Sequence, residues 1–133
     1  MAPFDMIANC LAVGAGGFVG AVARYLAGLA VPAQASGFPL ATFGVNVAGS
    51  FVIAFVFTLF ARMMGFDGRL LLFLTTGLCG GFTTFSTFTW ESLQMLQRGD
   101  YLVAGAYMLA SVAVCLVAAF AGQQAAGLVP VRG

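Results

Sequence analysis

The chain has 133 residues, of which 62% are hydrophobic and only 7% are charged, and its net charge at neutral pH is +1. A soluble domain carries about a quarter charged residues, so most of this surface must face lipid. The length fits one domain, expected here as a single transmembrane domain over residues 1–133. The sequence has no histidine and no lysine, which excludes histidine-based catalysis and imidazole-bound metals. It also shows no nucleophile–base pair, so enzyme activity is not expected.

Four apolar stretches are long enough to cross a bilayer, which takes about 20 residues for about 30 Å of hydrocarbon. They cover approximately residues 6–31, 41–64, 70–96 and 101–126. The connectors, residues 32–39, 65–69 and 97–100, are too short to hold a second domain. Backbone groups in lipid must form their hydrogen bonds within the segment, so we predict helices rather than strands. The expected fold is an all-α integral membrane protein with four transmembrane helices.

Positive charge is nearly balanced between the two ends of this bundle. Four spans place both termini on one side, with Arg62, Arg69 and Arg132, and leave Arg98 on the other side, joined by Arg24 if its side chain reaches that interface. Membrane orientation follows the Lys/Arg excess of short loops, and here the excess is small. The sequence therefore permits insertion in both orientations. It contains no internal repeat, so the second half of any pseudo-symmetric pathway would have to come from another chain.

The third stretch contains three glycines within five residues, Gly77, Gly80 and Gly81. Each costs a helix about 1 kcal/mol relative to alanine, which predicts a helix broken near its middle. Such a break is tolerated where the freed backbone is buried or lines a cavity, and broken helices often hold an ion. The alternative is that the glycines only allow close helix packing. A dense run of hydroxyls favours a functional break: Thr83, Thr84, Ser86, Thr87 and Thr89.

Aromatic and polar residues recur at helical spacing around this run. Phe82, Phe85 and Phe88 share roughly one face; packing is the ordinary explanation, but an electropositive ring edge can also face an anion. Two polar stripes with a spacing of four residues are Thr42, Asn46, Ser50 and Tyr107, Ser111, Cys115. Each stripe alone suits hydrogen bonding to a neighbouring helix. Together with the hydroxyl run they indicate a lined path, whose uncharged donors could replace the hydration shell of a small anion.

Three other residue types have competing interpretations. Arg24 either anchors its helix at the interface or raises the anion concentration at a pore mouth. Glu91 receives no assignment from the sequence. The cysteines Cys10, Cys79 and Cys115 lie in apolar stretches without paired spacing, and we interpret them as small buried hydrophobic residues.

Three segments resemble the Fluc (CrcB) fluoride channels of microbes: GFVGAVARY at residues 17–25, TFGVNVAGSF at residues 42–51 and GGFTTFSTF at residues 80–88. The resemblance extends over essentially the whole chain, and the last segment is the most specific. It implies a multi-pass protein of the bacterial inner membrane that forms an antiparallel homodimer of dual topology. It also implies passive export of fluoride from the cytoplasm through two pores at the dimer interface.

The resemblance also implies roles for individual residues. Asn46 matches the pore asparagine, and Phe85 and Phe88 match the paired pore phenylalanines. Arg24 matches an arginine near the pore entrance. Further polar positions along the implied path are Thr42, Thr84, Ser86, Thr87, Tyr107 and Ser111. The backbone carbonyls of Gly80 and Thr83 match the ligands of a structural sodium ion (Na+) at the dimer centre.

Cys115 departs from the serine or threonine expected at the end of the polar track on the last helix. A thiol is a weaker hydrogen-bond donor than a hydroxyl, so the outer end of the track differs in this chain.

Two other functions remain open at the level of sequence. A small dual-topology multidrug exporter has a similar size and charge balance, but it would be expected to carry an acidic residue deep in its first helix, where this chain has Arg24. A structural subunit of a larger complex would not explain the polar stripes. Hydroxyls and ring edges suit several halides, so the choice of fluoride comes from the resemblance alone.

Overall fold

The computed structural model describes residues 3–32, 37–63 and 67–131, and all regular structure within them is helical. The first two helices are α1 (Pro3–Ala30) and α2 (Leu40–Arg62). The third span consists of α3 (Gly68–Leu72), the π-helix η1 (Phe73–Cys79), α4 (Gly80–Phe82) and α5 (Phe85–Gln97), and α6 (Tyr101–Gly127) follows. Four helices are long and apolar enough to cross a membrane: Phe4–Ala30, Leu40–Arg62, Gly68–Gln97 and Tyr101–Gly127. The predicted four-span fold is confirmed.

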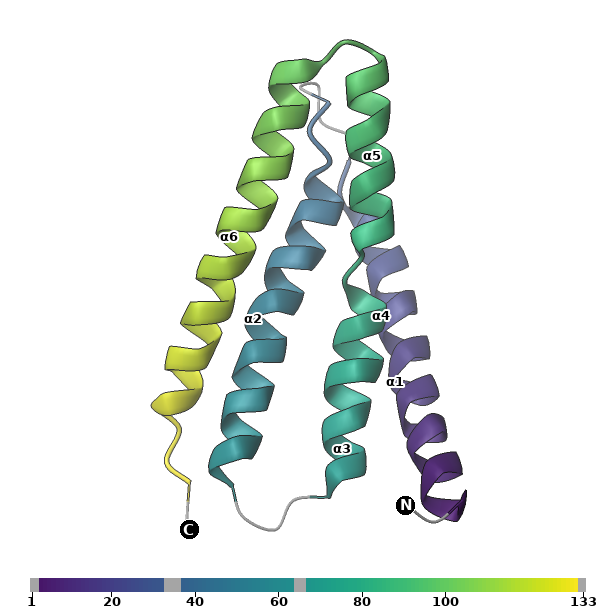
Figure 1. Cartoon of the computed structure of the whole chain (residues 1–133), viewed down its shortest axis with the longest axis vertical. Helices are drawn as coiled ribbons and strands as arrows, with labels where there is room; N and C mark the ends of the chain where they lie inside the picture. The colour runs from purple at the N-terminus through teal and green to yellow at the C-terminus, as the bar shows by residue number, and fades with distance from the viewer. Residues whose placement is uncertain (1–2, 33–36, 64–66, 132–133) are drawn as a thin grey trace.

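The start of α1, the end of α6 and the facing ends of α2 and α3 lie at one end of the molecule (Figure 1). The turn between α5 and α6 lies at the other end, where Gly99 takes the left-handed backbone conformation with a φ of 84°. Arg62 and Arg69 are therefore at the same end as both termini, and Arg98 is at the opposite end, as the sequence predicts. Arg132 lies outside the described residues.

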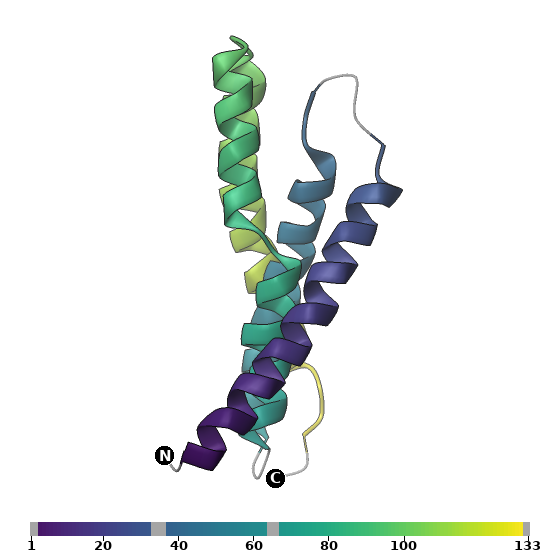
Figure 2. The same cartoon turned by 90° about the vertical axis from the view of Figure 1, so that its right-hand side faces the viewer.

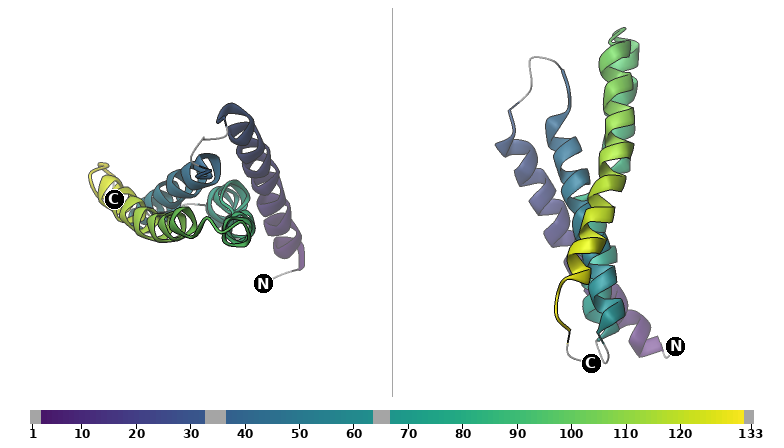
Figure 3. Two further views of the ribbon diagram at one scale, coloured as in Figure 1. Left: turned by 90° about the horizontal axis from the view of Figure 1, so that it is seen from above. Right: turned by 90° about the vertical axis from the view of Figure 1, so that its left-hand side faces the viewer.

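Close backbone packing fixes the third span between the other helices (Figure 3). A Cβ atom added to Gly20 of α1 would lie 2.1 Å from the carbonyl oxygen of Leu78, and one added to Gly81 would lie 2.5 Å from that of Gly17. The second helix pair, α2 and α6, is equally close: a Cβ atom on Gly122 would lie 2.2 Å from the carbonyl oxygen of Phe51. Such approach is possible only where the side chain is a hydrogen atom.

The third span is interrupted at Thr83 and Thr84, just after the glycines. Thr83 has a ψ of 161° and Thr84 a φ of −152°, which are extended conformations. Gly77 and Gly80 are helical, and Gly77 and Gly81 pack against α1. The expected break is present, but it lies after the glycines rather than at them, and for Gly77 and Gly81 the alternative of close helix packing holds. Beyond the break the span changes partners: η1 and α4 pack on α1, whereas α5 packs on α6 (Figure 2).

Candidate functional site

The side chain of Asn46 holds the interrupted backbone from α2. Its Oδ1 accepts a hydrogen bond of 2.8 Å from the backbone N–H of Thr84, and its Nδ2 donates one of 3.0 Å to the carbonyl oxygen of the same residue. One amide thus bonds both backbone polar groups of Thr84, the extended residue that precedes α5. Ser50 donates to the carbonyl oxygen of Asn46 at 2.7 Å, within α2. Asn46, predicted to line a pore, is therefore also the residue that shapes the break, and its second Nδ2 hydrogen remains for another acceptor.

Two backbone carbonyls are released from helical hydrogen bonds at this point. In an unbroken helix the N–H of Thr84 would bond to Gly80 and that of Thr87 to Thr83. Here Thr84 donates to Asn46, and Thr87 donates to the Oγ1 of Thr84 at 3.2 Å. The Thr83 oxygen instead accepts a 3.0 Å hydrogen bond from Nη1 of Arg24. Arg24 thus points inward to the break, which does not agree with a role as an interface anchor.

Thr84 also begins α5, because its side chain caps that helix. Besides accepting from the Thr87 N–H, its Oγ1 donates to the Thr87 hydroxyl at 3.0 Å and lies 3.4 Å from the Ser86 hydroxyl. A threonine that accepts a hydrogen bond from the N–H three residues later is a typical N-cap. Thr84, Ser86 and Thr87 of the hydroxyl run therefore form one local cluster at the start of α5, in which Thr84 is buried while Ser86 and Thr87 are exposed. The hydroxyls of Thr83 and Thr89 donate to the backbone carbonyls of Cys79 and Phe85 instead.

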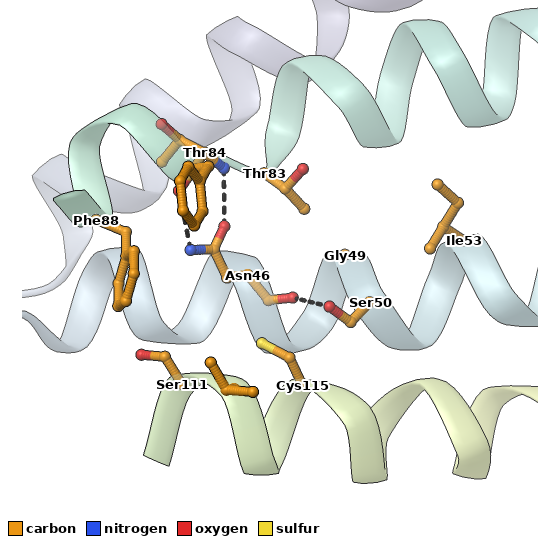
Figure 4. Close-up of a pocket in the computed structure, with 11 residues that line it drawn as sticks. Asn46, Gly49, Ser50, Ile53, Thr83, Thr84, Phe88, Ser111 and Cys115 are labelled. Atoms are coloured by element: carbon orange, nitrogen blue, oxygen red, sulfur yellow. Dashed lines mark hydrogen bonds between the residues drawn. The ribbon is translucent and has the colours of Figure 1, made fainter. Parts of the chain in front are cut away.

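A cavity of about 300 Å³ opens beside the break, between α2, α5 and α6 (Figure 4). We call it the break cavity, and it is lined by Asn46, Gly49, Ser50, Ile53, Thr83, Thr84, Phe85, Phe88, Ser111, Val112 and Cys115. It brings together residues from both predicted polar stripes and the two predicted pore phenylalanines. This chain does not close it, since the lining residue Phe85 is 79% exposed.

The aromatic rings lead from this cavity into the protein. The ring centroids of Phe85 and Phe88 are 5.6 Å apart, and those of Phe88 and Tyr107 are 5.1 Å apart. The ring of Phe38 also contacts Tyr107, in an edge-on arrangement with the centroids 5.2 Å apart. Tyr107 is fully buried, so it belongs to the core behind the cavity rather than to its wall.

Glu91, which the sequence left unassigned, is held by the first residues of both polar stripes. Thr42 donates to its Oε1 at 2.8 Å, and Tyr107 donates to its Oε2 at 2.7 Å. Hydrogen bonds to an ionised group are stronger than neutral ones, so these two hydroxyls stabilise a half-buried carboxylate at membrane depth. An acid inside a membrane span is a functional candidate in itself, and that signal was available in the sequence. The hydrogen-bond partners of Glu91 lie on two other helices and could not be identified from the sequence.

Two further cavities flank this cluster. One, of about 260 Å³, is lined by Arg24, Tyr25, Gly28, Leu29, Ala41, Thr42, Val45, Thr84 and Thr87. The other, of about 230 Å³, is lined by Glu91, Gln94, Met95 and Arg98 of the third span and by residues of the 31–41 region. Thr84 borders the first of these and the break cavity. The predicted site residues are thus divided. The break cavity is lined by Asn46, Thr83, Thr84, Phe85, Phe88 and Ser111. The 260 Å³ cavity is lined by Arg24, Thr42 and Thr87, and Ser86 and Gly80 are exposed.

Comparison with known proteins identifies the family of this chain. Residues 11–123 match the family described as CrcB-like protein, Camphor Resistance (CrcB). The chain belongs to the CrcB-like family. The match includes all three segments that carry the predicted resemblance, because residues 17–25, 42–51 and 80–88 all fall inside it.

Relatives within this CrcB-like family are similar over nearly their full length. The fluoride-specific ion channel FluC of Chlorobaculum tepidum is 50% identical over 116 residues, which cover 86% of this chain and 90% of the relative. The protein of the same name from Chlorobium phaeobacteroides strain BS1 is 42% identical over 124 residues, covering 93% and 97%. That of Elusimicrobium minutum is 48% identical over 120 residues, covering 88% and 92%. With its four spans, the CrcB-like chain is a multi-pass bacterial membrane protein.

Proposed function

We propose that this chain is a passive, fluoride-selective ion channel. The observation that carries the proposal is the break cavity, which places amide and hydroxyl donors and two phenylalanine rings at membrane depth without a carboxylate among its lining residues. Donors of this kind replace the hydration shell of a small anion. The relatives that carry the name fluoride-specific ion channel support fluoride over other halides.

The lining residues suggest how an anion is held in the break cavity. Nδ2 of Asn46 has one hydrogen beyond the one it gives to Thr84. Ser111 is buried, and among the described residues its hydroxyl oxygen has no hydrogen-bond partner. The edges of Phe85 and Phe88 carry partial positive charge. These groups together offer an anion several weak ligands, which favours passage over tight binding.

A second copy of the chain would complete the path. The break cavity is open at Phe85, and Gly80, whose carbonyl is released at the break, is also exposed. Unsatisfied backbone groups are costly in lipid, so this face requires protein against it. Because positive charge is nearly balanced between the two ends, we propose an antiparallel homodimer with pores at its interface, through which fluoride leaves the cytoplasm. A reporter fused to the C-terminus should then be found on both sides of the membrane, and one uniform orientation would contradict the antiparallel arrangement.

We also propose that the released carbonyls of two chains hold a sodium ion. The oxygens of Gly80 and Thr83 are hard ligands, which suit Na+ better than a soft metal, and a carbonyl that accepts from Arg24 keeps a second lone pair. In a two-fold dimer, the Gly80 and Thr83 oxygens of both chains would give four ligands. The ion would have a structural role, because it would hold the two helix breaks together. If replacing sodium with a bulky organic cation leaves dimer stability and flux unchanged, this ion is not required.

Anion efflux from liposomes that contain only the purified protein tests the proposed function. A channel should release fluoride without a proton gradient and should discriminate against chloride. A multidrug exporter would instead give proton-coupled uptake of an organic cation, and a structural subunit would give no flux. Fluoride efflux that depends on a proton gradient would overturn the passive mechanism.

Three variants test whether the break cavity is the path. Phe85→Ile and Phe88→Ile keep apolar bulk and remove the electropositive edge, so flux should fall severely while folding loses about 1.5 kcal/mol or less. Asn46→Asp puts a negative charge beside the anion and removes the donor to Thr84, and should block flux. Phe120→Ile is the matched control, because Phe120 is 63% exposed elsewhere on α6. If all three variants elute as folded protein and conduct like the parent, the proposed path is wrong.

A further inference from the structure

Cys115 is a free thiol on the wall of the break cavity. It lies one helical turn from Ser111 on α6, and both side chains face α2 across the cavity (Figure 4). The other two cysteines have different surroundings. Cys10 is exposed on α1, which does not line this cavity, and Cys79 is only 1% exposed. The chain therefore carries three thiols in three environments: outer surface, core and cavity.

Ser111 provides a second, independent indication that a small molecule can be accommodated beside this thiol. The residue is only 6% exposed, and within the part of the chain that the structure describes its Oγ has no hydrogen-bond partner. Buried hydroxyls in proteins are nearly always hydrogen-bonded, so this one is available to an occupant of the cavity. The volume of about 300 Å³ far exceeds the roughly 30 Å³ that a water molecule takes up in the liquid.

We propose that Cys115 is a modification site on the permeation path, at which small, uncharged, thiol-directed electrophiles react and slow the flux of fluoride. The effect on flux rests on the proposed channel function, but the reaction itself does not. An uncharged reagent is required because the cavity lies at membrane depth, where an ion must first lose its water. The two other thiols do not share this effect, since neither lies on the cavity.

Methyl methanethiosulfonate is a suitable probe of this class. The sulfur of Cys115, as the thiolate, attacks the methylthio sulfur of the reagent. A new S–S bond forms, the bond between the methylthio and sulfonyl sulfurs breaks, methanesulfinate leaves with the electron pair, and the thiol proton goes to water. The product has lost the S–H donor and carries an added methylthio group that projects into the cavity next to Ser111 and Ser50. Both changes oppose passage of a hydrated or partly hydrated anion.

The experiment uses the full-length protein in liposomes, with fluoride efflux and peptide mass measured before and after treatment. Treatment should add one methylthio group at Cys115 and slow efflux about tenfold, equivalent to raising the transport barrier by about 1.4 kcal/mol. Dithiothreitol should remove the group and restore efflux in the same sample. Efflux through Cys115→Ser should be the same with and without the reagent, whatever its untreated rate, and Cys10→Ala, the matched control, should remain as sensitive as the parent.

Three results would overturn the inference: Cys115 unmodified while Cys10 reacts, Cys115 modified with efflux unchanged, or equal sensitivity in Cys115→Ser. Reversal by dithiothreitol in the parent keeps the test valid even if Cys115→Ser folds poorly. A parent that releases no fluoride before any reagent is added contradicts the proposed function instead, so the two failures are distinguished by the untreated sample.

Discussion

Before the break, the third span contacts α1 through glycine backbones, and after it the same span contacts α6 and α2 through side chains that carry hydroxyls and a carboxylate. On the first half, the atoms that would meet a Cβ on Gly77 or Gly81 are backbone atoms of α1. On the second half, Thr84, Thr87 and Glu91 are held by polar side chains. The comparison indicates that the first half anchors the span and the second half provides the chemistry, with Asn46 at their junction.

The largest expected effect comes from the anchoring half. Gly20→Ala and Gly81→Ala place a Cβ 2.1 Å and 2.5 Å from backbone oxygens that cannot rotate away, so the helices must separate. We expect a loss of about 1–3 kcal/mol in stability, the usual cost of overpacking, seen as a lower melting temperature in detergent.

Gly14→Ala and Gly28→Ala are the matched controls for this prediction, because a Cβ at either position meets nothing within 4 Å. Alanine also favours a helix over glycine by about 1 kcal/mol, so these two variants should be neutral or more stable. Equal destabilisation by all four substitutions would show that close packing is not the reason for glycine in the anchoring half.

A smaller effect is expected in the second half, at the Glu91 carboxylate. Tyr107→Phe removes one of its two hydroxyl donors and keeps the ring that packs on Phe88. Hydrogen bonds to charged groups contribute about 1.5–3 kcal/mol, so Tyr107→Phe should lose stability by an amount in the lower part of that range. The loss should be seen as a lower melting temperature and slower fluoride efflux. Tyr101→Phe is the control, since Tyr101 is 69% exposed. If Tyr107→Phe and Tyr101→Phe have the same melting temperature and the same efflux, the hydrogen bonds to Glu91 do not stabilise the second half of the span.

The smallest effect is expected at the end of the anchoring half, where Arg69 forms an exposed ion pair with Asp5 of α1 at 3.0 Å. Exposed pairs contribute about 0.2–1 kcal/mol, so Asp5→Asn should barely change the melting temperature. It leaves the arginines unchanged, and the distribution of the C-terminal reporter should therefore stay the same. A shift of that distribution in Asp5→Asn would show that this ion pair, rather than the arginine balance, sets the orientation. Asp100→Asn is the control, because its pair with Arg98 lies within one turn.

The sequence predicts the four spans well because lipid imposes a single requirement, length with low polarity, that can be counted along the chain. It predicts the break less well. Glycine propensity located the interruption near Gly80, but the extended residues are Thr83 and Thr84. Their conformation depends on Asn46, 38 residues earlier than Thr84, and a partner at that separation leaves no local pattern.

Site residues show the same division. Asn46, Phe85, Phe88 and Ser111 could be chosen from spacing and resemblance, and the structure brings them to one cavity. The bond from Arg24 to the Thr83 carbonyl and the two bonds to Glu91 could not be chosen, because each depends on how helices are rotated against one another. How each helix is rotated about its axis depends on packing at positions such as Gly20 and Gly81. The residues Arg24 and Glu91, whose direction follows from that rotation, do not themselves indicate it.

The π-helix η1 therefore controls the direction in which the rings point. Consecutive residues of an α-helix are offset by about 100° around its axis, and a π-helical turn takes up additional chain without lengthening the span by a full turn. If residues Phe73–Cys79 were wound as an ordinary α-helix, the extra residue would turn everything after it through about that angle. Phe85 and Phe88 would then swing away from Asn46 while α3 stayed against α1. The wider winding of η1 thus determines the direction around the helix axis in which Phe85 and Phe88 point.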